Sequence, residues 1–261
     1  MNCRGKRTRV SPSFILFEFR NITGNPYVHI FGIGMPVLMT VVIAKVMALN
    51  LSDESVLSTV VTGIFLGMGA MIPLATILMG YAATYSQELE KGIPQRMELF
   101  GISQTMTIIH RIISELIFQI CAFAIYFIVG FFILRIQPPM VSGLICYIIC
   151  IGVLAVISFM LAHAIALFCK KFAIVYCISM MLYFCIMIAS GMMGINYEML
   201  PSSVQAISKL LPTTYITKDF ADIWLGKEYN FMPMLQAYLF VGTFSGIILF
   251  FCLKRNGRKI A

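Results

Sequence analysis

Three ionisable residues lie inside long apolar stretches of the chain and are the first candidates for chemistry: Arg111, Glu115 and His163. Ionisable side chains in such surroundings are costly and commonly mark a pathway, a gate or a structural pair. Arg111 and Glu115 are four residues apart and share one helix face, so we expect either a local ion pair or a gating or coupling role. For His163, a hydrogen bond between helices and a proton relay are both open.

The sequence offers little else that could support catalysis. It has only 3 His and no paired acids or Ser/His/Asp set at one depth. Near Glu115 only His110 could join as a metal ligand, which is too few for a metal site. The 8 Cys contain no C-x-x-C pair, and no G-x-x-x-x-G-K-[ST] phosphate loop occurs. We therefore expect no catalytic, cofactor or metal site on this chain.

The composition places the chain in a membrane. Of its 261 residues, 60% are hydrophobic and 11% are charged, whereas a soluble domain has about 25% charged residues. This is more apolar surface than one soluble core of this size can bury, so part of it must face lipid. The composition excludes a soluble enzyme, a disordered chain and a nucleic-acid-binding module, even though the net charge is +8.

The apolar residues gather into stretches long enough to span a bilayer, which takes about 20 residues. We predict six transmembrane helices at about residues 28–49, 56–85, 105–134, 140–168, 172–195 and 232–253. Gly67, Gly69 and Pro73 fall within the second stretch and predict a kink there. The expected fold is therefore an all-α membrane protein whose transmembrane domain covers residues 28–253.

Basic residues predict the orientation of the spans. If both termini are cytoplasmic, most of the 19 Lys and Arg residues lie on the cytoplasmic side, as the positive-inside rule requires. The cytoplasmic N-terminus then covers residues 1–27, with no cleaved signal peptide. Residues 254–261 form a basic cytoplasmic tail beside anionic lipid. We expect a multi-pass protein of the cytoplasmic (inner or plasma) membrane.

A short amphipathic helix is predicted before the first span. Ser11-Pro12 is a helix start, Gly24-Asn25-Pro26 is a stop, and Phe17 and Glu18 lie between them. This segment is too short to span, so it should lie along the cytoplasmic membrane face. It either couples to another protein or only anchors the chain to the surface.

The segment at 86–104 is the most charged stretch within the body of the chain. Gly92 and Gly101 break it and Pro94 can restart a helix, which predicts a short amphipathic element on the cytoplasmic side. Its charged and apolar side chains suit docking on another protein, and a solvated turn between two spans is equally open. Its candidate contact residues are Glu88, Glu90, Arg96, Met97 and Phe100.

The segment at 196–230, outside the cell, is too apolar for a polar linker. A long structureless loop is uncommon, and Pro201 and Pro212 bracket one helical pattern while a second follows it. We expect two short helices whose apolar faces could enter the outer leaflet, with Trp224 at the membrane interface. In the fifth span, Met187 belongs to a methionine cluster that either packs or faces lipid, or lines a path for amphipathic molecules.

Several of these residues carry a resemblance to a known family. The run Glu88-Leu89-Glu90-Lys91-Gly92-Ile93-Pro94-Gln95-Arg96, closed by Ile102-Ser103, resembles the coupling stretch of type-2 ABC exporter permeases. Leu200-Pro201 and Leu211-Pro212-Thr213-Thr214-Tyr215 resemble that family's hairpin before the last span. The resemblance covers about residues 12–255. Ile93, Gln95 and Gly101 depart from the usual Thr, Glu and Pro, which could change how the loop meets its ATPase.

The resemblance implies a function and a role for each candidate residue. It implies a permease subunit that exports an amphipathic or hydrophobic substrate, such as a drug, an antimicrobial peptide or a lipid-like molecule. A separate ABC ATPase dimer would bind ATP and Mg²⁺, and a second copy or a related permease would complete the path. The ATPase-coupling residues would be Phe17, Glu18, Glu88, Glu90, Gly92, Arg96, Met97 and Phe100. The extracellular gate, a re-entrant-like hairpin, would use Pro201, Leu211, Pro212, Thr213 and Tyr215. The candidates for the substrate path or gating would be Arg111, Glu115, His163 and Met187.

One alternative function remains open from the sequence. An ion-coupled secondary carrier or a channel would work without an ATPase. Such a protein would usually carry several intramembrane charges and inverted repeats, and the sequence shows neither.

Overall fold

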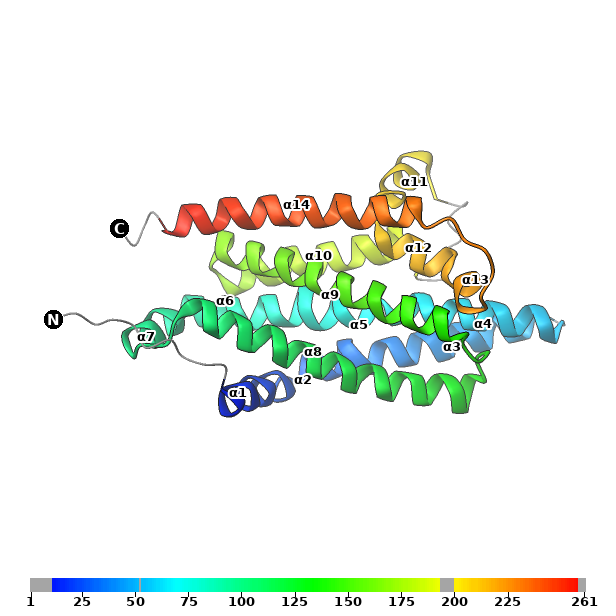
Figure 1. The fold of residues 1–261 in the computed structure, drawn as a ribbon, viewed down its shortest axis with the longest axis horizontal. Coiled ribbons are helices and arrows are strands. Elements are labelled where there is room, and N and C mark those ends of the chain that lie inside the picture. Colours follow the sequence, from blue (N-terminus) through cyan, green and yellow to red (C-terminus); the bar gives the residue numbers. More distant parts are fainter. Residues whose placement is uncertain (1–10, 52, 193–199, 258–261) are drawn as a thin grey trace.

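The computed structural model describes residues 11–51, 53–192 and 200–257. Within them the chain forms helices and no strand, arranged as one elongated bundle (Figure 1). Six helical segments are long and apolar enough to cross a membrane, which confirms the all-α fold with six spans. Their bounds are Ile30–Asn50, Glu54–Glu90, Gln104–Leu134, Val141–Cys169, Phe172–Ala189 and Met232–Arg255. Parts of the predicted N-terminus (residues 1–10), of the fifth span and the hairpin (residues 193–199) and of the basic tail (residues 258–261) lie outside the described part of the chain.

The spans are assembled from regular and π-helical pieces. In chain order they are α1 (Pro12–Thr23), α2 (Pro26–His29), η1 (Ile30–Gly34), α3 (Met35–Asn50), α4 (Glu54–Gly69), α5 (Met71–Pro73), η2 (Leu74–Tyr81), α6 (Ala82–Glu90), α7 (Ile93–Leu99), α8 (Gln104–Val129), η3 (Gly130–Leu134), α9 (Val141–Cys169), α10 (Phe172–Ala189), α11 (Ser202–Ser208), α12 (Pro212–Lys218), α13 (Phe220–Trp224) and α14 (Met232–Gly257). The segments labelled η are π-helical.

The second span is the most buried of the six and forms the centre of the bundle. Its helix is interrupted after Gly69, and a π-helical stretch, η2, follows Pro73. Proline lacks a backbone N–H and disturbs the regular hydrogen-bond ladder, and π-bulges are a common result of such local disturbance. The helix is therefore irregular near Gly69 and Pro73, where the kink was predicted, and the kink itself stays a prediction.

Two predicted boundaries are wrong. Helix α10 ends at Ala189 rather than continuing toward residue 195, because Gly191 adopts the left-handed conformation with φ 72°. Helix α6 continues to Glu90, so Glu88 and Glu90 lie in the last turns of the second span rather than in a loop. The sequence-based prediction started the loop too early, because the charged residues at 88–91 indicated a solvent-exposed loop. The helix instead continues beyond its apolar part as far as Glu90.

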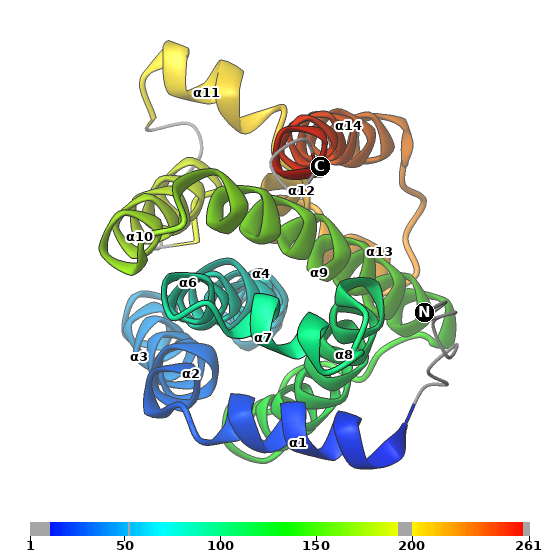
Figure 2. The same ribbon diagram turned by 90° about the vertical axis from the view of Figure 1, so that its left-hand side faces the viewer.

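The two ends of the bundle differ in construction. Helices α1 and α7 and the last turns of α14 lie at one end, which we call the α7 end (Figure 1). Helix α1 runs across the bundle axis and packs on α8 (Figure 2), which confirms the predicted short helix before the first span. Helices α12 and α13 lie at the opposite end, which we call the hairpin end. The outer faces of the spans expose large apolar side chains, such as Ile148 and Phe244, as lipid-facing helices do.

Candidate functional site

A tight turn between α6 and α7 sets the direction of α7. Gly92 has φ 67°, a left-handed conformation that glycine adopts without a steric penalty. Pro94 lies in the first turn of α7, where its missing N–H costs no hydrogen bond. After α7, Gly101 has φ 83°, and the Ser103 hydroxyl caps α8 by accepting the Met106 N–H at 3.3 Å. The predicted breaks at Gly92 and Gly101 and the helix start at Pro94 are therefore confirmed.

Helix α7 presents apolar side chains outward. Leu99 is 87% exposed and Phe100 is 85% exposed, and Arg96 on the same short element is also exposed. Phe17 is exposed on the outer face of α1. A cleft of about 570 Å³ lies between α1, α6 and α7, and Phe17 and Met97 line it. The α7 end thus offers an apolar surface next to an open groove.

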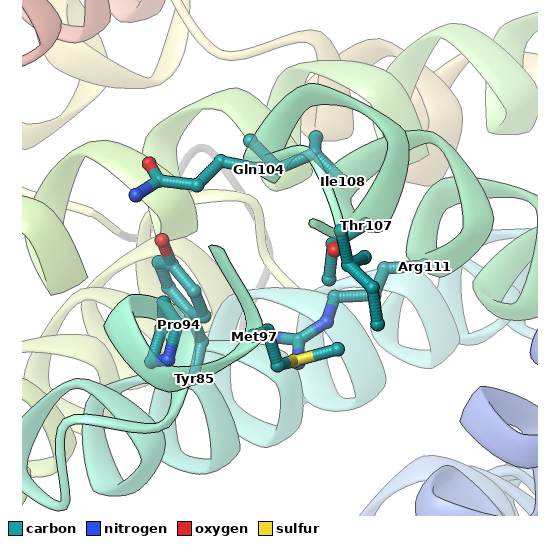
Figure 3. A pocket seen from close by; sticks show the side chains of 8 residues that line it. Tyr85, Pro94, Met97, Gln104, Thr107, Ile108 and Arg111 are labelled. Atoms are coloured by element: carbon teal, nitrogen blue, oxygen red, sulfur yellow. The ribbon is translucent and has the colours of Figure 1, made fainter. Parts of the chain in front are cut away.

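The inner face of α7 reaches the bundle at Met97. The Met97 side chain points into a small pocket of about 20 Å³, together with Arg111, Pro94 and Tyr85 (Figure 3). Helix α7 is connected to α8 on one side and to α6 on the other. Met97 of α7 and Arg111 of α8 therefore line the same pocket.

Arg111 on α8 holds three elements together. Its guanidinium donates to Glu18 of α1, with Nε and Oε1 at 3.3 Å, and makes a short ion pair with Glu88 of α6. It also lies over the Tyr85 ring, 5.2 Å from the ring centroid, a distance typical of cation–π contacts. Arg111 and Glu18 are both buried. Because this charge cluster is buried, removing one member would leave its partners without compensation.

The predicted ion pair between Arg111 and Glu115 is wrong. Within the described residues Arg111 pairs with Glu18 and Glu88, and the Glu115 Oε2 atom is buried without a hydrogen-bond partner. The two residues do share a helix, as predicted, but α1 and α6 bring competing carboxyl groups to the guanidinium. Glu18 and Glu88 were predicted as coupling residues on a surface, and the structure instead buries them largely in this internal cluster.

Helix α1 is attached to α8 by polar contacts as well as by packing. The Ser11 N–H donates to His110 Nε2 at 3.0 Å, and the Ser114 hydroxyl donates to the Ile15 carbonyl at 2.9 Å. The Phe14 ring packs edge-on against His110, with centroids 4.8 Å apart. Burial raises the pKa of Glu18, and the nearby Arg111 guanidinium opposes part of that rise. The docked position of α1 therefore depends on a buried carboxyl group.

A second cleft lies beside the C-terminal end of α1. It has a volume of about 620 Å³ and is bounded by α1, η2, α6 and the start of α10. Near it, the Glu90 carboxylate accepts the Phe172 N–H at 3.3 Å, so the end of α6 contacts the first turn of α10. Glu90, predicted as a coupling residue, is exposed at the α7 end and contacts the fifth span.

His163 on α9 is hydrogen-bonded between helices, which confirms one of its two predicted roles. Its Nδ1 atom lies 2.7 Å from the Tyr81 hydroxyl, and its ring stacks on Tyr85 with centroids 4.8 Å apart. Sequence analysis missed Tyr81 and Tyr85 as parts of the site. The sequence pattern that could have identified them is their spacing of four residues, which puts both rings on one helix face.

The predicted gate residues lie together at the hairpin end. Pro201 precedes α11 and Leu211 precedes α12, while Pro212 is the first residue of α12. The Thr213 hydroxyl is hydrogen-bonded to the Ser190 hydroxyl after α10, and the Tyr215 hydroxyl donates to the Lys209 carbonyl at 3.0 Å. These uncharged contacts connect α11 and α12 to the end of the fifth span.

The predicted position of Trp224 at the membrane interface is wrong. Trp224 is fully buried, and its indole N–H donates to the Gln137 carbonyl at 2.9 Å. Gly143 on α9 makes room for this packing, since a Cβ atom there would lie 2.8 Å from the Trp224 Cα atom. In the fifth span, Met187 is also buried in the core, which confirms its packing interpretation and leaves a role in a path as a prediction.

Comparison with known families identifies the kind of protein to which the chain is similar. A family model described as an ABC-2 type transporter matches residues 13–225. The matched region begins in α1 and ends directly after α13, so it contains both the charge cluster and the hairpin end. No curated protein matches the chain.

Proposed function

The chain belongs to the ABC-2 type transporter family, whose members are the membrane permeases of ABC transporters, and on that premise we propose that it exports an amphipathic or hydrophobic substrate with energy from a separate ATPase subunit. The substrate class would be a drug, an antimicrobial peptide or a lipid-like molecule. ATP and Mg²⁺ would bind to the ATPase, because this chain has no phosphate loop.

The proposed arrangement places the α7 end in the cytoplasm and the hairpin end outside the cell membrane. The basic residues before α1 and after α14 favour this orientation. Six spans are few for an enclosed path, so a second copy or a related permease would pair with this chain, with two-fold symmetry as the common solution. Helices α12 and α13, which pack against α4, would form the re-entrant part of an outer gate.

The single observation that carries the coupling proposal is the exposed apolar tip of α7. Phe100 is 85% exposed, which is unusual for a large aromatic side chain unless it faces lipid or a partner. It directly follows α7, whose Ile93 and Met97 line the groove between α1 and α7. Force from an ATPase docked there would reach Arg111 through Met97 and then α1 through Glu18.

A pull-down experiment tests this proposal. The tagged chain would be purified from its native membranes in mild detergent, and the amount of co-purified ATPase subunit would be measured. Phe100→Ala should lower that amount by about tenfold, if the side chain behaves as an interface hot spot. Phe132→Ala is the matched control, since Phe132 is 81% exposed in η3, at the far end of the third span.

Two outcomes would contradict the proposal. If Phe100→Ala and Phe132→Ala retain the ATPase equally, then α7 is not the docking element. If the wild-type chain purifies without any ATPase, an ion-coupled carrier or a channel becomes the better explanation.

A further inference from the structure

A small acidic cavity lies where α1, η2, α6 and α8 meet. Its volume is about 20 Å³, close to the space that one water-sized group occupies. Its polar lining includes Glu18, Glu88, Arg111, Glu115, Thr84 and Tyr81. Three carboxyl groups therefore surround one guanidinium at a place that is largely shielded from water.

Glu115 is the member of this cavity that the protein itself does not satisfy. Its side chain belongs to a residue that is only 3% exposed, and its Oε2 atom has no hydrogen-bond partner within the described residues. Buried polar groups are normally paired, and an unpaired carboxylate is costly. Because Arg111 already engages Glu18 and Glu88, the Glu115 Oε2 atom is open to a donor from outside the chain.

The other charged or titratable groups near the cavity do not neutralise it. Arg20 on α1 and Lys91 after α6 are exposed, and no ion pair in the described residues joins either of them to the three carboxyl groups. His110 Nε2 accepts the Ser11 N–H, so His110 is engaged with α1. His163 is engaged with the Tyr81 hydroxyl. The cavity therefore has an excess of acidic groups.

The surroundings indicate which kind of cation would fit. The cavity shares Asn21, Gly80 and Thr84 with the cleft of about 620 Å³. That cleft is lined by polar residues such as Gln87 and by apolar residues such as Met79 and Phe172. Within the described chain no acidic or histidine cluster is arranged to hold a metal ion. An organic cation with an apolar body suits both spaces.

We propose that the cavity between Glu18, Glu88 and Glu115 binds the primary ammonium group of an amphipathic amine, whose apolar part lies in the cleft between α1, α6 and α10. Glu115 accepts a hydrogen bond from the ammonium group, and Thr84 and Tyr81 line the remaining space. The proposal rests on the proposed function, since it names the chemical class of the molecule that the permease would receive.

The test uses the purified chain in phosphatidylcholine nanodiscs without any ATPase. The probes are dodecylamine, dodecyltrimethylammonium and dodecanol, which share one alkyl chain and differ in charge and head size. Binding is titrated through the shift of the thermal unfolding midpoint. Dodecylamine should bind at least tenfold more tightly than dodecyltrimethylammonium, because the trimethylammonium head group is too large for the cavity. Dodecanol should show only partitioning into the membrane.

Variants locate the binding site. Glu115→Gln should weaken dodecylamine binding at least tenfold and remove the preference for the primary amine. Glu54→Gln is the control, because Glu54 is an exposed acid at the opposite end of the bundle, and it should bind as the wild type does. If Glu115→Gln does not fold, the comparison of the two cationic probes on the wild-type chain still decides the question.

Two results would overturn the proposal. One is equal affinity of the wild type for dodecylamine and dodecyltrimethylammonium, and the other is unchanged amine binding in a folded Glu115→Gln variant. If the wild type shows no amine selectivity and Glu115→Gln changes the pH dependence of unfolding, then Glu115 binds a proton and no amine. Because no ATPase is present, these failures leave the permease function intact, and failure of the Phe100 pull-down would leave amine binding intact.

Discussion

The two ends of the bundle are held together by different forces. At the α7 end, buried charges connect α1, α6 and α8 through Arg111, and clefts of about 570 and 620 Å³ border α1 and α6. At the hairpin end, α12 and α13 pack closely on the spans, with Trp224 fully buried against α9. The hydroxyl groups of Thr213 and Ser190 form a buried, uncharged hydrogen bond there, whereas the ion pair between Lys227 and Asp222 lies on the surface.

This difference indicates which end can rearrange. An ion pair with two carboxyl partners can exchange one partner for another, and open clefts leave room for the elements to move. Close backbone contact resists small displacements, because packed interiors are not continuously deformable. We infer that the α7 end is the adjustable part of the molecule and that the hairpin end is the rigid part.

The largest expected effect comes from removing the charge at the centre of the α7 end. Arg111→Met leaves Glu18 and Glu88 without their cation, and breaking a buried ion pair costs about 3–5 kcal/mol. The measurement is thermal unfolding of the purified chain in detergent. Arg96→Met is the control, because Arg96 is exposed and forms no ion pair with a described residue.

A triple variant sharpens this test. Adding Glu18→Gln and Glu88→Gln to Arg111→Met removes the uncompensated charges and should restore most of the lost stability. If Arg111→Met unfolds at the wild-type temperature, the charge cluster does not hold α1 and the proposed difference between the two ends fails.

The second effect tests the close packing at the hairpin end. A Cβ atom at Gly143 would lie 2.7 Å from the Ile223 carbonyl oxygen and 2.8 Å from the Trp224 Cα atom, so backbone must move. Gly143→Ala should cost about 1–3 kcal/mol, as overpacking usually does. Gly152→Ala on the same helix is the control, since nothing lies within 4 Å of its Cβ position, and it should be neutral or slightly stabilising. Equal behaviour of the two variants would show that the hairpin end is not rigid.

The fold could be predicted from the sequence because hydropathy is a local property, which can be read from neighbouring residues. The six spans, the break near Pro73 and the turn at Gly92 each depend on residues close together in sequence. The partners of Arg111 could not be predicted in this way. Glu18 lies 93 residues away from it and Glu88 lies 23 residues away, whereas the helical pattern pointed to Glu115 on the same helix.

The hairpin end shows the same limit. Tryptophan commonly lies at a membrane interface, so composition favoured an exposed Trp224. Its burial depends on Gly143, which is far away in sequence and leaves space for the backbone of α13. A single sequence shows that a small residue is present but not which element approaches it.

A smaller effect concerns the pH dependence of the α7 end. Burial raises the pKa of Glu18 above its ordinary value of 4.5, so the folded chain binds this proton more tightly than the unfolded chain does. The contribution of Glu18 to stability therefore falls as pH rises from 4.5 through the raised folded pKa. Relative to Glu18→Gln, the wild type should lose stability across this window. The check is chemical denaturation of both proteins over that pH range, and parallel curves would show that Glu18 is not desolvated.

The smallest expected effect is at a surface charge of the hairpin end. Asp53 caps α4 by accepting the Ser55 N–H at 2.9 Å, and hydrogen bonds from Ser55 hold the pKa of Asp53 below its ordinary value of 3.8. The ionised cap therefore contributes stability above pH 3.8, and this contribution is lost as pH falls through the lower folded pKa. Asp53→Ala should lower the unfolding temperature at pH 7 by less than Gly143→Ala does, and the two proteins should converge at acidic pH. Because Asp53 is exposed, water can partly satisfy the N–H groups that its side chain caps. The buried partners of Arg111 have no such substitute. A loss in Asp53→Ala as large as that in Arg111→Met would mean that burial does not distinguish the charges of the two ends.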